Sequence, residues 1–175
     1  MDTWKAWCRS MKMAGAGMII VTGEWSAEHL STGRSVAGNT LIAASEPAPP
    51  QTLADVVHLS SPSHASAWQS SILGVSITSY PEALVALEAG CKYVIAPSDD
   101  PLLFEGLARL EQTRQLTWFV DGCTTLDDLQ RVIGAGAKRV VMKTNDPLEV
   151  TTWANTLRQA RRSPAPGERV NMGGL

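Results

Sequence analysis

Apolar residues along this chain fall into short runs that alternate with amphipathic stretches. Three of these runs follow an Ala-Gly pair, at residues 14–20, 89–95 and 135–141. We expect each Gly (Gly15, Gly90, Gly136) to follow the end of a helix in the left-handed conformation, which Gly adopts without a Cβ penalty. The short apolar run that comes next is typical of a parallel strand buried on both faces.

Further apolar runs bring the predicted strands to seven, at 17–22, 40–44, 55–59, 72–77, 92–96, 116–120 and 138–142. Helix-start signals lie between most of them. Ser79 and Glu82 predict a capping box, and Asp146 and Glu149 repeat this arrangement with Pro at the first helical position. Thr125 opens another helix, whose Leu, Val and Ile residues recur at helical spacing.

The alternation of strands and helices predicts an α/β fold with parallel strands and right-handed crossovers. Spacing alone leaves two architectures open, a doubly wound sheet and a closed barrel. A full (β/α)₈ barrel usually takes about 200 residues or more, whereas this chain has 175, and no strand precedes the helix predicted at 4–13. We expect one domain over 1–161, with one strand missing, and a flexible C-terminal tail over 162–175.

Composition limits the classes of partner. The net charge is −2, with 44% hydrophobic and 18% charged residues, which is ordinary for a globular domain and provides no basic stripe for nucleic acid. Cys8, Cys91 and Cys123 are widely spaced and predict neither a disulfide framework nor a zinc site, as expected of a cytoplasmic protein. No apolar run approaches the roughly 20 residues that a membrane-spanning helix needs.

Four sequence motifs between Ala54 and Arg161 resemble motifs of the thiamine phosphate synthase and thiazole tautomerase superfamily, and they occur in the same order. Residues 54–59 (ADVVHL) resemble the family's A-D-G-V-H-L, and residues 73–83 (LGVSITSYPEA) resemble G-V-S-x-H-S-x-x-E-A. Residues 87–94 resemble the A-G-A-D-Y-V entry to the sixth strand, and 125–141 the phrase leading into the eighth. The resemblance implies a TIM-barrel-like (β/α) repeat whose first strand is absent.

The family joins a pyrimidine pyrophosphate to a thiazole phosphate with Mg²⁺, and the resemblance does not extend to the residues for this step. The family's Q-x-R-x-K pyrophosphate cluster corresponds to residues 21–24 (VTGE), and its two Mg²⁺ carboxylates to Ser45 and Ser63. The tautomerase's catalytic His corresponds to Thr78. Two functions stay open: a divergent synthase-like transferase or tautomerase, and a non-catalytic small-anion-binding or regulatory protein on the same scaffold. No cofactor is identified.

Barrel active sites lie at the C-terminal ends of the strands. In this chain that criterion selects Glu24, Ser45, Ser60, Ser76, Ser98, Asp99, Asp121, Lys143 and Thr144. Asp121 and Lys143 end successive strands, where they could act as catalytic base and electrophile or form a structural ion pair. The turns that hold Gly122, Thr124, Lys143 and Thr144 precede helix N-termini at the usual barrel phosphate site, which predicts binding of a small phosphorylated ligand. No metal ligand is predicted.

Some residues carry two interpretations. A lone His58 on an apolar strand is more often a hydrogen-bonded core residue than a catalytic one. Cys123 precedes a helix start, which could lower its thiol pKa. Bulky apolar residues of the N-terminal helix either pack over the barrel or mediate a homodimer, through this helix or an open barrel edge. These residues are Trp4, Trp7, Met11 and Met13.

Overall fold

The computed structural model describes residues 2–22, 27–47, 54–68 and 72–162. The strands are β1 (Met18–Val21), β2 (Leu41–Ser45), β3 (Val56–Leu59), β4 (Ile72–Ser76), β5 (Tyr93–Pro97) and β6 (Thr117–Asp121). The helices are α1 (Asp2–Ala14), α2 (Ala27–Ala37), the 3₁₀ helix η1 (Pro62–Ala67), α3 (Tyr80–Glu88), α4 (Pro101–Arg114), α5 (Leu126–Gly134) and α6 (Pro147–Arg162). The candidate site residue Glu24, and the predicted tail beyond Arg162, lie outside the described residues.

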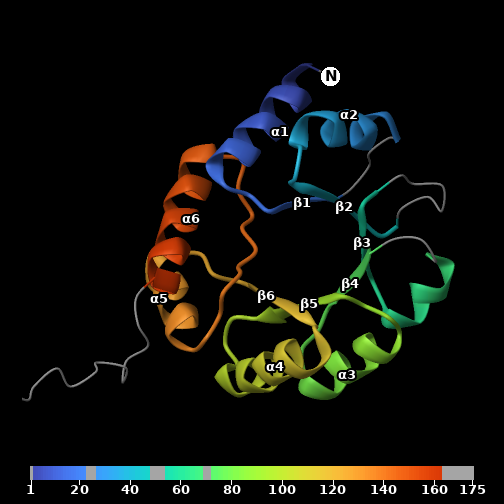
Figure 1. The fold of residues 1–175 in the computed structure, drawn as a ribbon, viewed down its shortest axis with the longest axis vertical. Helices are drawn as coiled ribbons and strands as arrows, with labels where there is room; N and C mark the ends of the chain where they lie inside the picture. Colours follow the sequence, from blue (N-terminus) through green and yellow to red (C-terminus); the bar gives the residue numbers. More distant parts are fainter. Residues whose placement is uncertain (1, 23–26, 48–53, 69–71, 163–175) are drawn as a thin grey trace, which may run out of the picture.

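The six strands form one parallel sheet in the order β1-β2-β3-β4-β5-β6. Figure 1 shows the sheet curling around a central axis, with the α-helices arranged around its outside. A doubly wound sheet would carry helices on both faces. The structure therefore confirms the α/β, TIM-barrel-like expectation, with fewer strands than predicted.

The seventh predicted strand, at 138–142, does not form. A single parallel bridge joins Val140 to Val120, supported by hydrogen bonds from Val120 N to Arg139 O (3.0 Å) and from Val141 N to Val120 O (2.8 Å). Among the described residues no strand pairs with the far edge of this segment. Because residues 138–142 pair with no described strand except β6, they make one bridge and then lead into α6.

Helix α1 covers the barrel beside the edge strand β1. It lies between α2 and α6 (Figure 1), and its buried Cys8 and Met11 join Ile19 of β1 and Val150 of α6 in one apolar cluster. Trp4 and Trp7 stack with their ring centroids 5.3 Å apart, and both pack against this cluster. Packing over the barrel therefore accounts for most of the apolar side chains of this helix.

Met13, the remaining one of these side chains, is 87% exposed. A homodimer through the helix or the open edge stays a prediction.

Helix ends follow the predicted pattern in their glycines but not in every cap. Gly15, Gly90 and Gly136 have φ values of 104°, 92° and 102°, which confirms the left-handed turns. The predicted capping box at Ser79 is wrong, because its side chain makes no cap bond and the Glu82 carboxylate accepts from Thr78 N (2.6 Å) instead. Here the carboxylate reaches back one residue further than a capping box requires.

At α6 the cap uses a different pair of side chains from the one predicted. Asp146 Oδ1 accepts a hydrogen bond from Leu148 N (2.9 Å), while Asp146 N donates to Thr144 Oγ1 (3.1 Å). Thr144 thus provides the bond that Glu149 was expected to provide. Glu149 is left exposed on the first turn of the helix.

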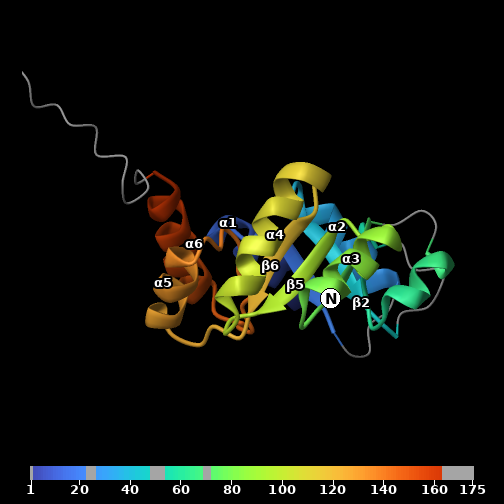
Figure 2. The ribbon, with the colours of Figure 1, turned by 90° about the horizontal axis from the view of Figure 1, so that it is seen from below.

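The interior of the curled sheet is apolar in its middle and polar at one end. Ala43, Val56, Tyr93 and Ile95 form the buried interior cluster, against which Phe119 packs. Because residues two apart on a strand face the same side, the strand-end residues Ser45, His58 and Asp121 share this inward face. Figure 2 shows β5 and β6 pointing toward a common end of the barrel. Asp121, the last residue of β6, lies at this end.

No described helix is long and apolar enough to span a bilayer.

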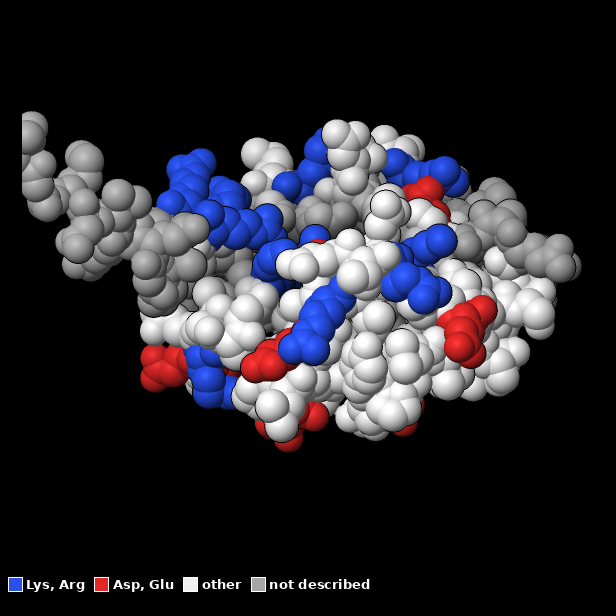
Figure 3. Space-filling model, turned by 60° about the horizontal axis from the view of Figure 1, so that its bottom comes forward, with Lys and Arg blue, Asp and Glu red and all other residues white. Residues whose placement is uncertain are grey.

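The face drawn in Figure 3 carries Lys and Arg in small separate groups among uncharged and acidic residues.

Candidate functional site

Asp121 and Lys143 meet at the C-terminal end of the barrel, as the strand ends predict. Lys143 Nζ lies 3.1 Å from Asp121 Oδ2, and the two side chains are 79% and 34% exposed. Asp121 is the last residue of β6, and Lys143 follows the segment anchored by the Val120–Val140 bridge. The bridge therefore determines how closely the two charges approach.

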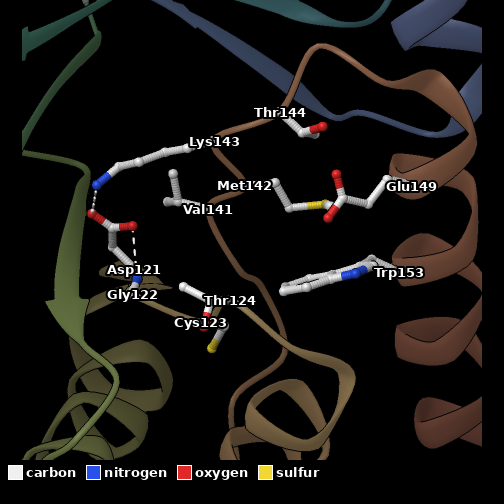
Figure 4. Close-up of a pocket in the computed structure, with 10 residues that line it drawn as sticks. All are labelled: Asp121, Gly122, Cys123, Thr124, Val141, Met142, Lys143, Thr144, Glu149 and Trp153. Carbon is white, nitrogen blue, oxygen red and sulfur yellow. Dashed lines mark hydrogen bonds and ion pairs between the residues drawn. The ribbon is translucent and has the colours of Figure 1, made fainter.

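Beside this ion pair lies a cavity of about 220 Å³, shown in Figure 4. The predicted residues Asp121, Gly122, Thr124, Lys143 and Thr144 all line it. The other lining residues are Cys123, Val141, Met142, Glu149 and Trp153. The fold thus gathers the five predicted site residues into one place, and what they bind or catalyse stays a prediction.

The hydrogen-bond donors at the start of α5 are already satisfied within the chain. Thr124 N, Thr124 Oγ1 and Thr125 N each donate to Asp128 Oδ2 at 3.1 Å, and Asp128 N donates to Thr125 Oγ1. These bonds, led by the one from the Thr124 amide, lower the pKa of Asp128 to about 2. Gly122 N likewise donates to Asp121 Oδ1 at 2.7 Å. An anion in the cavity would compete with these carboxylates for the same donors.

Sequence reasoning missed the contribution of α6 to the site. Glu149 and Trp153 stand four residues apart and therefore on one face of the helix, and both line the cavity. Figure 4 shows them opposite the Asp121–Lys143 pair. The four-residue spacing of a carboxylate and an indole next to a predicted barrel site was the available signal.

The expectation for Cys123 is wrong in direction. Burial raises the pKa of its thiol, and the nearby carboxylates of Asp128 and Asp121 raise it further, against a smaller lowering by Arg131. The thiol is only 9% exposed. Cys123 therefore belongs to the apolar wall of the cavity rather than to its reactive groups.

His58 is hydrogen-bonded at both ring nitrogens, as its ordinary interpretation expects. Nδ1 lies 3.0 Å from Tyr93 Oη and Nε2 lies 3.1 Å from Ser76 Oγ. Burial lowers the pKa of His58 and outweighs the opposing charge of Glu46, whereas burial raises the pKa of the Tyr93 phenol. The side chain is thus a neutral member of the barrel wall near physiological pH.

Glu46 forms a second polar cluster at the same end of the barrel, which sequence reasoning also missed. Its Oε2 accepts from Ser60 N, Ser60 Oγ and His64 Nδ1, each at 2.8 Å, and its Oε1 from Trp68 Nε1 at 3.1 Å. Burial alone would raise the pKa of Glu46, but these hydrogen bonds prevail and lower it to about 2. The carboxylate ties the end of β2 to η1.

Ser45 and Ser63, which the resemblance aligns with the family's two Mg²⁺ carboxylates, carry hydroxyls instead. Ser45 ends β2, and Ser63 lies in η1, where its Oγ is 2.8 Å from Ser61 Oγ. Within the part of the chain that the structure describes, no three His, Cys, Asp or Glu side chains are grouped so that they could hold a metal ion.

Comparisons with known proteins bear on the fold. No protein-family model and no curated protein matches the sequence. A thiamine phosphate pyrophosphorylase from Pyrococcus furiosus is similar in structure, with a TM-score of 0.68 and 19% identity over 91% of this chain and 91% of that one.

Two further structures with the same fold are more distant. The 2-keto-3-deoxy-6-phosphogluconate aldolase of Zymomonas mobilis ZM4 has a TM-score of 0.56 at 12% identity, over 89% of this chain and 85% of that one. The N-acetylmannosamine-6-phosphate 2-epimerase from Clostridium perfringens has a TM-score of 0.57 at 15% identity, over 87% and 83%. At these identities the similarity shows that the chain shares a (β/α) fold with synthases, aldolases and epimerases.

Proposed function

We propose that this chain is a small-anion-binding protein on a scaffold related to thiamine phosphate synthase, and that Lys143 is the counter-charge for the anion. The position of Lys143 carries the proposal. Lys143 lines the cavity from the segment that leads into α6, where barrels commonly bind phosphate, and its ammonium faces Asp121 (Figure 4).

The exposure of the Asp121–Lys143 pair supports a binding role. Exposed ion pairs contribute about 0–1 kcal/mol to stability, and Lys143 is 79% exposed. Folding therefore gains little from placing this charge at a cavity. Three of the structural neighbours are named for phosphorylated compounds, which favours a phosphorylated ligand for this chain as well.

The synthase reaction is disfavoured by the chemistry of the site. Ejection of pyrophosphate needs several positive charges or a metal ion to stabilise the leaving group. Among the described residues, Lys143 is the only Lys or Arg that lines the cavity. Ser45 and Ser63 stand where the resemblance leads us to expect the family's metal carboxylates. Hydroxyls are weak substitutes for carboxylate ligands of Mg²⁺.

An enzyme of changed chemistry is the second candidate, and the same ion pair favours it. Asp121 would act as general base and Lys143 as electrophile toward a small anion. In that case Asp121→Asn abolishes turnover of the bound ligand while leaving its binding intact, whereas a binding protein shows no turnover in either form.

Thermal-shift and calorimetric titrations test the proposal. The probes are inorganic phosphate, pyrophosphate, thiamine phosphate, thiazole phosphate, and pyrimidine pyrophosphate with Mg²⁺. We expect saturable stabilisation by at least one of them, its loss in Lys143→Met and its retention in Lys92→Met. Lys92 is a matched control because it is exposed and immediately precedes β5, at the N-terminal end of the barrel. No stabilisation by any probe, or equal binding by both variants, would overturn the proposal.

A further inference from the structure

The cavity beside Lys143 contains more negative than positive charge. Asp121 and Glu149 line it with two carboxylates, and Lys143 supplies one ammonium. Asp121 already shares that ammonium at 3.1 Å. A simple anion would therefore enter a site whose own charges sum to −1.

Glu149 is the charged group that this balance leaves uncompensated. The structure gives its carboxylate no hydrogen bond or ion pair with any other described residue, since Thr144 and Asp146 form the cap at α6. In Figure 4 the carboxylate points from α6 toward the cavity, above the ring of Trp153 and beside the side chain of Met142. Within the described part of the chain this exposed carboxylate has no protein donor.

Several hydrogen-bond donors of the cavity, in contrast, already have acceptors within the protein. Both donors of Thr124 serve Asp128, and the Gly122 amide serves Asp121. Among the described lining residues, Lys143 is the charged donor that a ligand can share, and Glu149 is the carboxylate that has no partner within the protein. These two groups come from opposite sides of the cavity (Figure 4).

We propose that the ligand of this cavity is a zwitterion, whose anionic group is held by Lys143 and whose cationic nitrogen is held by Glu149. This inference rests on the proposed function and names the class of ligand, a small aminoalkyl phosphate. In such a compound the cationic nitrogen neutralises the Glu149 carboxylate while the anionic group neutralises the Lys143 ammonium. A plain phosphate leaves the charge of Glu149 unneutralised.

The walls of the cavity fit the cationic end of such a ligand. Trp153 and Met142 flank the Glu149 carboxylate. An indole attracts a cation through its ring quadrupole, and a thioether is a polarisable apolar neighbour. A volume of about 220 Å³ is smaller than the usual drug-sized pocket, which restricts the ligand to a short chain between the two charges.

Calorimetric titration with three probes of similar size tests the inference. Phosphoethanolamine carries both charges, propyl phosphate only the anion, and ethanolamine only the cation. We expect the wild-type chain to bind phosphoethanolamine about tenfold more tightly than propyl phosphate. Glu149→Gln should remove this preference without weakening propyl phosphate, and Lys143→Met should weaken both phosphates.

Glu88→Gln is the matched control, because it makes the same charge change on an exposed residue of α3. It should leave all affinities unchanged, and the melting temperature of each variant reports its folding. Equal binding of phosphoethanolamine and propyl phosphate, or a preference that survives Glu149→Gln, overturns the zwitterion inference and leaves the anion-binding proposal standing. Absence of binding by both phosphates to the folded wild-type chain overturns both.

Discussion

The phenol ring of Tyr93 lies directly over Gly74, so that a Cβ added to Gly74 would overlap the ring. Tyr93 is the first residue of β5 and Gly74 the middle residue of β4, and the two are paired in the parallel register. The absence of a side chain at Gly74 lets the ring cross the barrel interior and place its hydroxyl 3.0 Å from His58 Nδ1. One glycine thus determines how the interior is filled.

Gly74→Ala should destabilise the protein by about 2 kcal/mol, because overpacking a core forces side chains or backbone to shift. Chemical denaturation measures this change. Gly134→Ala is the matched control, since a Cβ at this end of α5 meets nothing within 4 Å. It should change stability by less than about 1 kcal/mol, in the stabilising direction. Equal effects of the two substitutions would show that the ring of Tyr93 is not constrained by Gly74.

Glu46→Gln should lower stability near neutral pH by about 2 kcal/mol, because hydrogen bonds to a charged group are lost. The folded-state pKa of Glu46 is about 2, below its ordinary value of 4.5. The stabilisation from the carboxylate is therefore fully present above pH 4.5 and lost as the pH falls from there toward 2. Melting temperatures of wild type and variant should converge over this range.

Glu88→Gln provides the control for the charge change and should follow the wild-type melting curve across the same pH range. A difference between wild type and Glu46→Gln that stays constant from pH 7 to pH 3 would contradict the prediction, because the effect would then not depend on ionisation of the carboxylate.

Asp121→Asn should increase affinity for phosphate probes about three- to tenfold, since the neutral amide no longer competes for the Lys143 ammonium. Stability should change by less than about 1 kcal/mol because the pair is exposed. Calorimetry measures the affinity. Glu105→Gln is the matched control, because it removes one negative charge at an exposed residue of α4. Weaker binding in Asp121→Asn would show instead that Asp121 holds Lys143 in its binding position.

The three cysteines should resist a disulfide reagent in the native protein. Burial raises the pKa of Cys8 to about 11 and also raises those of Cys91 and Cys123, which keeps the thiols protonated at pH 8. All three are at most 9% exposed. Absorbance after adding Ellman's reagent should show no fast phase until guanidinium is added. Rapid reaction of one thiol in the native state would contradict its burial.

Much of the fold follows from local pattern. Six predicted strands lie within one residue or so of their observed limits, because a short apolar run between turn signals contains the information for a buried strand. The glycines that follow α1, α3 and α5 were predicted from their Ala-Gly context, since only Gly adopts that backbone conformation without strain. The proximity of Asp121 and Lys143 followed from their places after two successive predicted strands, although the second of these runs makes only an isolated bridge to β6.

Other features depended on which parts of the chain meet in space. The run at 138–142 has the composition of a strand, but a strand also needs partners, and within the described residues it makes only the Val120–Val140 bridge. The Glu46 cluster joins residues 14 to 22 positions apart. Glu149 has the sequence context of a capping residue, and the competing bond from Asp146 to Thr144 leaves it facing the cavity.

The sequence by itself determined six strands, most of the helices between them, the glycine turns and the barrel end at which the candidate site residues lie, because these depend on burial and backbone preference over a few residues. Only the tertiary structure decided that Glu149 and Trp153 complete the cavity, that Asp128 occupies the donors of Thr124, and that Cys123 is buried. Each of these results from hydrogen bonds or burial that depend on the final positions of neighbouring groups, which a linear pattern does not specify.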